Sequence, residues 1–183
     1  MKPKLIIFTD VGDTIIDEGT EVRRVPCGIV YHAKCIPGAK ETLLALHRRG
    51  YTIVMVADGL VESFHNTMKE NGLYQVFRAE VISETLKVEK PNPLMFQTAM
   101  ERLGLTEQDK ARVIMVGNNI KRDVVGANRF GIRSVLLDWS PRYQYAAQAP
   151  EEEPSFRVHR PEELLPLVER LNEEAERELG AGS

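Results

Sequence analysis

KLIIFTDVGDT, at Lys4–Thr14, is the stretch that decides the fold of this chain. The four consecutive apolar residues from Leu5 to Phe8 are typical of a β-strand covered on both faces, as in a parallel sheet. The apolar run stops at Asp10, and Gly12 lets the chain turn sharply directly afterwards. Because ligands bind at the carboxyl ends of the strands in open α/β sheets, the carboxylate of Asp10 is a candidate functional group.

The composition indicates one globular domain. With 183 residues and 43% hydrophobic content the chain suits one well-buried domain and is short for two, so we expect a single domain over 1–183. The net charge of −3 gives no basic surface for nucleic acid or for an anionic membrane. The first apolar run is too short for a signal peptide or a membrane-spanning helix, and two cysteines suit a reducing compartment. We expect a cytoplasmic protein without nucleic-acid or membrane partners.

Apolar strands alternate with helices along the rest of the chain. After the first strand we expect strands at Thr52–Val56, within Phe77–Ser83, and at Arg112–Val116, Arg133–Leu137 and Phe156–Val158. We expect helices at Ala39–Arg49, Val61–Asn71, from Pro91 onward, at Ile120–Phe130 and at Pro161–Leu179. This alternation predicts an α/β fold, a three-layer α/β/α Rossmann-like parallel sheet with right-handed crossovers.

The stretch Ile15–Ile36 has no helical period, and we interpret it as a short β-flap with a connecting loop. It contains three candidate zinc ligands, Cys27, His32 and Cys35. Their spacing matches no common structural-zinc pattern and no fourth ligand lies nearby in the sequence. An ordinary role within the flap is the favoured interpretation.

Asp10 alone is weak evidence for a site, because a carboxylate after a strand is more often a cap or a turn residue. Three further stretches follow their own strands or open helices, in order: Val54–Gly59 (VMVADG), Glu89-Lys90-Pro91 and Val116–Asp123 (VGNNIKRD). Together with DVGDT they resemble the four signature motifs of the haloacid dehalogenase-like (HAD) hydrolase superfamily. The resemblance covers about residues 4 to 138.

The resemblance implies a HAD-like fold in which the strand before Asp10 neighbours the strand before Asn118. Asp10 would then lie close to Asn118 and Asp123. Cap domains are often inserted after the first strand of HAD proteins, but about twenty residues leave room only for a flap or minimal cap at about 15–36. We therefore expect a site open to solvent unless another subunit covers it, so a homo-oligomer remains an open alternative.

The resemblance also implies that Asp10 is a nucleophile that forms an aspartyl-phosphate. Attack of a carboxylate on a phosphate dianion needs nearby cations, which Lys90 and a bound Mg²⁺ would supply. Lys87 is the alternative lysine. The expected Mg²⁺ ligands are Asp10, the backbone carbonyl of Gly12, and Asn118 or Asp123.

Three positions depart from the phosphatase pattern of the superfamily. Gly12 replaces the second Asp, which acts as acid and base, and Asp13 cannot be assumed to reach the same point. Ala57 replaces a phosphate-binding hydroxyl, although backbone N–H groups around Ala57-Asp58-Gly59 could bind an oxyanion.

The third departure is Asn118, which stands where an acidic metal ligand is usual. Asn119 is a further candidate for substrate binding. Either asparagine could instead cap the helix that follows.

The leading hypothesis is a Mg²⁺-dependent phosphatase that acts on a small phosphorylated metabolite through an aspartyl-phosphate. The alternatives are a metal-independent hydrolytic dehalogenase and a catalytically weakened HAD-fold binding protein. Specificity would come from the flap and from the loop Trp139–Tyr145, where Arg142, Tyr143 and Tyr145 could contact a ligand or a neighbouring subunit.

Overall fold

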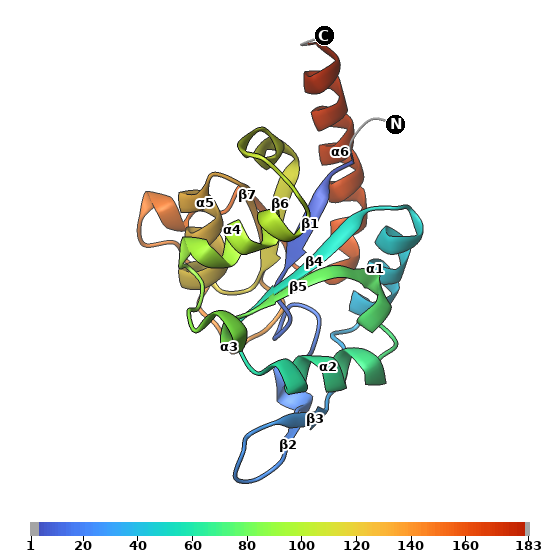
Figure 1. Cartoon of the computed structure of the whole chain (residues 1–183), viewed down its shortest axis with the longest axis vertical. Helices are drawn as coiled ribbons and strands as arrows, with labels where there is room; N and C mark the ends of the chain where they lie inside the picture. The colour runs from blue at the N-terminus through green and yellow to red at the C-terminus, as the bar shows by residue number, and fades with distance from the viewer. Residues whose placement is uncertain (1–3, 182–183) are drawn as a thin grey trace.

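The core of the fold is a six-stranded sheet in which every neighbouring pair of strands is parallel. The computed structural model describes residues 4–181. The strands lie in the order β5-β4-β1-β6-β7-β8 (Figure 1). Their bounds are β1 Ile6–Thr9, β4 Thr52–Ala57, β5 Phe77–Ile82, β6 Val113–Gly117, β7 Arg133–Leu137 and β8 Phe156–Val158. The predicted parallel sheet is confirmed.

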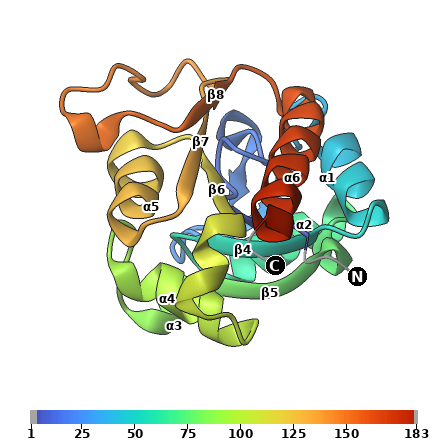
Figure 2. The same ribbon diagram turned by 90° about the horizontal axis from the view of Figure 1, so that it is seen from above.

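Helices cover both faces of the sheet, as Figure 2 shows from above. One face carries α1 Ala39–Arg48, α2 Val61–Glu70 and α6 Leu164–Ala181. The other face carries α3 Ser83–Leu86, α4 Pro93–Arg102 and α5 Val125–Phe130. The three predicted layers are therefore present.

The apolar run of β1 divides its side chains between these two faces. Leu5 and Ile7 belong to the core beneath α1, α2 and α6, whereas Ile6 and Phe8 belong to the core beneath α4 and α5. All four side chains are at most 4% exposed. An uninterrupted apolar strand is what burial on both faces requires.

Short helices of other types complete the connections. The 3₁₀ helices are Glu18–Thr20, Tyr74–Val76, Glu107–Arg112, Pro150–Glu152 and Pro161–Glu163, and a single π-helical turn spans Ile120–Val124. The helix predicted at Ile120–Phe130 thus begins as a π turn and continues as α5.

The prediction that Pro91 starts a helix was wrong. Helix α4 begins at Pro93, and Asn92 caps it by accepting the Leu94 N–H at 3.0 Å. Because Asn is a strong N-cap and Pro suits the first helical position, the second proline of PNP sets the boundary.

The predicted flap is an antiparallel pair, β2 Val22–Arg23 and β3 Val30–His32, which projects beyond the carboxyl ends of the sheet strands (Figure 1). It rests on α2, where Ser63 Oγ accepts the Val30 N–H at 3.0 Å and Asn66 donates to the Val30 carbonyl at 3.1 Å. No large cap domain is present between residues 4 and 181.

The three candidate zinc ligands of the flap have separate surroundings. Cys27 is exposed, His32 pairs with Glu70, and Cys35 packs against the core. Among the described residues no group of three or more His, Cys, Asp or Glu side chains is arranged to hold a metal ion. Within the same residues, no helix combines the length and apolarity that crossing a membrane requires.

Candidate active site

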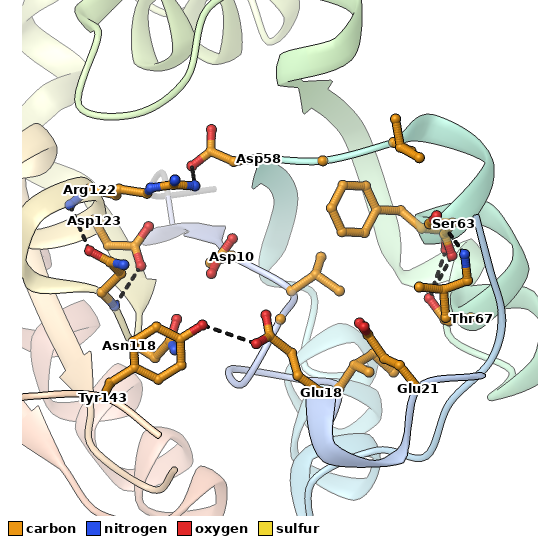
Figure 3. Close-up of a pocket in the computed structure, with 18 of the residues that line it drawn as sticks. Asp10, Glu18, Glu21, Asp58, Ser63, Thr67, Asn118, Arg122, Asp123 and Tyr143 are labelled. Atoms are coloured by element: carbon orange, nitrogen blue, oxygen red, sulfur yellow. Dashed lines mark hydrogen bonds and ion pairs between the residues drawn. The ribbon is translucent and has the colours of Figure 1, made fainter. Parts of the chain in front are cut away.

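The site lies where β1 and β6 run side by side at the carboxyl edge of the sheet. Thr9 pairs with Val116, and the Asp10 N–H donates to the Val116 carbonyl at 2.9 Å. The loops that follow the two strands therefore start next to each other, as expected. Figure 3 shows Asp10, Asn118 and Asp123 around one pocket.

Lys90 enters this cluster from the segment before α4. Its Nζ lies 2.9 Å from Asp10 Oδ1, 2.7 Å from Asp123 Oδ1 and 2.7 Å from the Val56 carbonyl oxygen. The residue is 2% exposed, whereas Lys87 is exposed. The structure thus brings the expected lysine to Asp10. The three N–H donors of its ammonium already have acceptors.

The charged groups of this cluster shift one another's pKa values. The pKa of Asp10 is raised to about 7, chiefly by burial. The Lys90 ammonium lowers this pKa, and the Asp123 carboxylate raises it. Burial opposes the charge of Lys90, but the facing carboxylates of Asp10, Asp123 and Asp58 outweigh it and raise the pKa of that ammonium. Lys90 is therefore a permanent positive charge beneath Asp10.

Asp123 uses both of its carboxylate oxygens within the protein. Oδ1 accepts from Lys90, and Oδ2 accepts the Asn119 N–H at 3.0 Å. Gly117 makes this approach possible, since a Cβ at that position would lie 2.2 Å from the Asp123 carboxylate. Each of these oxygens keeps a second lone pair, with which Asp123 could also bind a metal ion.

A different set of oxygens converges beside Asp10. One atom of the Asn118 amide group lies 3.2 Å from both Asp10 Oδ2 and the Gly12 carbonyl oxygen. In one orientation of the amide its NH₂ group donates to both oxygens, and in the other its own oxygen faces them. Three oxygens from a carboxylate, a carbonyl and an amide suit a hard divalent cation. The residues present therefore fit Mg²⁺, with oxygen atoms of Asp10, Gly12 and Asn118 as the candidate metal ligands.

The candidate substrate-binding residues are placed differently from one another. Ala57 is buried in β4 and does not line the pocket. The Asp58 carboxylate accepts the Lys90 backbone N–H at 3.0 Å, and its Oδ2 lies 3.6 Å from Arg122 Nη1. The Gly59 N–H donates to Ser83 Oγ at 2.9 Å, so an oxyanion would have to displace that hydroxyl.

Asn119 both lines the pocket and caps the helical turn that follows. Its side-chain oxygen accepts the Arg122 N–H at 3.1 Å. The capping interpretation of the sequence thus applies to Asn119, while Asn118 faces Asp10.

Asp13 does not face the pocket. It is fully buried and adopts a positive φ of 46°. Its carboxylate accepts from Arg142 Nε at 2.9 Å and from Arg142 Nη2 at 2.8 Å, from Ser140 Oγ at 2.9 Å and from the Glu18 N–H at 3.0 Å. These contacts tie the loop after β7 to the loop after β1, and they leave Asp13 no access to a ligand beside Asp10.

The pocket has a volume of about 240 Å³, and the flap and α2 supply the wall opposite β6. Five carboxylates line it, from Asp10, Glu18, Glu21, Asp58 and Asp123, against the two cationic side chains of Arg23 and Arg122. This excess of negative charge is a further reason to expect a cation when an anionic ligand binds.

Glu18 was missed in the sequence. Tyr143 donates its O–H to Glu18 Oε2 at 3.0 Å, and both side chains line the pocket (Figure 3). Burial, followed by the charge of Asp13, raises the pKa of Glu18, while the Tyr143 hydrogen bond opposes the shift. No motif spacing connects Glu18 to Asp10, because only the folded flap brings it to the pocket.

Comparisons with known proteins identify the family and the fold. The model of the haloacid dehalogenase-like hydrolase family matches residues 22–137. A glyceraldehyde 3-phosphate phosphatase of Methanopyrus kandleri is 31% identical over 140 residues, which are 76% of this chain and 59% of the relative. An (S)-2-haloacid dehalogenase 4A of Burkholderia cepacia is 31% identical over 113 residues, 60% of this chain and 47% of the relative.

Solved structures show the same fold. A dehalogenase with an intermediate complex superposes with a TM-score of 0.72 at 18% identity, covering 91% of this chain and 98% of the other. The chain spans about half of the length of the curated relatives it matches. Since the family model covers more than half of the chain, this protein belongs to the haloacid dehalogenase-like hydrolase family.

Proposed function

We propose that the chain is a Mg²⁺-dependent phosphatase that hydrolyses a small phosphomonoester through an aspartyl-phosphate at Asp10. The observation that carries the proposal is the Lys90 ammonium, buried and 2.9 Å from Asp10. Phosphatase relatives such as the Methanopyrus kandleri protein support it. We further propose that the chain acts as one domain whose minimal cap is the flap at about 15–36.

The chain's own residues account for most of the chemistry. An Asp10 oxygen attacks phosphorus and the bond from phosphorus to the ester oxygen breaks, which leaves an acyl phosphate on Asp10. Water then attacks that phosphorus, inorganic phosphate leaves and the Asp10 carboxylate is restored. Because the three Lys90 donors are already bonded, Lys90 contributes positive charge and holds Asp10 in place.

Asp10, the Gly12 carbonyl and Asn118 would hold Mg²⁺, with a free lone pair of Asp123 as a further ligand. The bound ion would supply the positive charge that lets an anionic phosphate approach a pocket lined by five carboxylates. A site with fewer acidic ligands binds such an ion more weakly.

The direct test is hydrolysis of an aryl phosphate with and without Mg²⁺, using wild type and Asp10→Asn. We expect Mg²⁺-dependent phosphate release that Asp10→Asn abolishes. Mass spectrometry of rapidly quenched wild-type protein should find the phosphoryl group on the peptide that contains Asp10. Phosphate release that survives Asp10→Asn would overturn the proposal.

Two alternatives are separated by simple assays. A metal-independent dehalogenase has support from the dehalogenase relatives, but the excess of carboxylates in the pocket disfavours a haloacid anion. Release of halide without added metal would favour it. A binding protein without catalysis would be stabilised against heat by fluoroberyllate with Mg²⁺ and would release no phosphate.

A further inference from the structure

We propose that Glu18 is the proton donor to the leaving oxygen, and that its carboxyl group takes the space a side chain at position 12 would fill. This inference rests on the proposed phosphatase function. An alkoxide that departs from phosphorus needs a proton, so the pocket must present an acid near Asp10.

The backbone of Gly12 and the side chain of Glu18 meet closely. A Cβ atom built on Gly12 would lie 2.1 Å from Glu18 Oε1 and 3.1 Å from its carboxyl carbon. Gly12 has no positive φ, so its backbone conformation is open to other residues. A side chain at position 12 would therefore have to displace the Glu18 carboxyl group, which occupies that space.

The other carboxylates of the pocket have partners that occupy them. Asp123 is bonded through both oxygens, and Asp58 accepts from Lys90 and faces Arg122. Glu21 pairs with Arg23. Glu18 differs from them, because Oε2 accepts from Tyr143 while Oε1 has no hydrogen-bond partner among residues 4–178.

Two contacts hold Glu18 in this position. Asp13 accepts its backbone N–H at 3.0 Å, and Tyr143 donates to its side chain at 3.0 Å. Asp13 also binds Arg142, the neighbour of Tyr143, so one buried carboxylate fixes both segments. In Figure 3 Glu18 and Tyr143 border the pocket on one side of Asp10, and Asp58 and Arg122 border it on the other.

Glu18 alone can supply the proton of the first step and take up the proton of the second. The Glu18 carboxyl gives its proton to the ester oxygen as the bond to phosphorus breaks, and the alcohol leaves. The resulting carboxylate then takes a proton from the water that attacks the acyl phosphate of Asp10. This returns the Glu18 carboxyl to its starting form, and no further reactant is needed.

The test compares two substrates in Glu18→Gln. An aryl phosphate such as 4-nitrophenyl phosphate has a leaving group that departs without a proton, whereas glycerol phosphate has one that needs it. We expect steady-state turnover of glycerol phosphate to fall by about 100-fold or more. With 4-nitrophenyl phosphate we expect a burst of one nitrophenolate per protein followed by slow turnover, since only the water step then lacks its base.

A rescue variant places the carboxylate at position 12 instead of position 18. Gly12→Asp combined with Glu18→Ala removes the clashing group and restores an acid at residue 12, so it should turn over glycerol phosphate at least about tenfold faster than Glu18→Ala alone. Glu173→Gln, an exposed change on α6, is the matched control and should behave as wild type. Melting temperatures establish that each variant is folded.

Two results would overturn the role of Glu18. One is wild-type turnover of glycerol phosphate by Glu18→Gln, and the other is an equal loss on both substrates without a burst. Failure of the phosphatase proposal has a different signature, because wild type itself would then release no phosphate from either ester in the presence of Mg²⁺.

Discussion

Asp13 and Arg142 form a bidentate ion pair, with Arg142 Nε 2.9 Å from Oδ2 and Arg142 Nη2 2.8 Å from Oδ1 of a fully buried carboxylate. The two residues come from the loop after β1 and the loop after β7. Asp13 therefore fastens the two loops that supply Glu18 and Tyr143, and it is part of the scaffold of the pocket.

Replacement of Asp13 by Asn should lower the free energy of unfolding by about 2 kcal/mol. The change removes the charge that Arg142 faces, and the new NH₂ group puts a donor opposite either the Glu18 N–H or the Ser140 hydroxyl, which are bonded to different oxygens of Asp13. Urea denaturation measures the loss. The matched control is Asp17→Asn, which weakens a partly exposed contact to the same Arg142 and should cost about 1 kcal/mol or less. Equal losses in the two variants would contradict the role assigned to Asp13.

Lys90→Met should abolish phosphatase activity and destabilise the fold by about 3 kcal/mol. The reason is that Asp10 and Asp123 would then face each other without the ammonium that both contact. The double variant Lys90→Met with Asp123→Asn removes one of the two charges, so it should recover most of the stability and none of the activity. Thermal unfolding and phosphate release separate the two effects. Activity in the double variant would show that Lys90 serves the fold alone.

The sequence was sufficient to predict the sheet because the four inner strands, β4, β1, β6 and β7, carry the apolar runs that burial on two faces demands. Asp10 and Lys90 were predicted from motifs that end strands or precede helices, and the sheet order then brings them to one edge. The start of α4 was misplaced because two prolines, Pro91 and Pro93, compete for it and only the Asn92 cap decides.

The site details that were missed depend on contacts between distant segments. Glu18 lies in an irregular flap, and its distance to Gly12 follows from how the flap folds back over β1. The same is true of Asp13, whose burial depends on Arg142, 129 positions along the chain. Neither relationship has a local periodicity or spacing from which it could be predicted.

Asn118→Asp should strengthen Mg²⁺ binding by about tenfold or more, because a second carboxylate would then stand beside Asp10 and the Gly12 carbonyl. Asn118→Ala should weaken binding, since the amide oxygen is lost. Titration calorimetry with MgCl₂ measures both changes without any substrate. Asn119→Ala serves as a control because its side chain caps the next turn. Unchanged affinity in both Asn118 variants would place the ion elsewhere.

The two cysteines should differ sharply in reactivity toward iodoacetamide. Cys27 is exposed at the tip of the flap, whereas Cys35 packs against the core and burial raises its pKa to about 11 from 9.0. Near pH 8 that shift leaves Cys35 about 100-fold less thiolate than an ordinary cysteine, and the thiolate is the reactive form. Mass spectrometry of the alkylated peptides should therefore find Cys27 modified first and Cys35 long afterwards.

The control is the same reaction in urea, where both cysteines should react at similar rates if folding causes the difference. Rapid alkylation of Cys35 in the folded protein would mean that the segment from the flap to α1 opens readily, and Glu18 would then lack a rigid support.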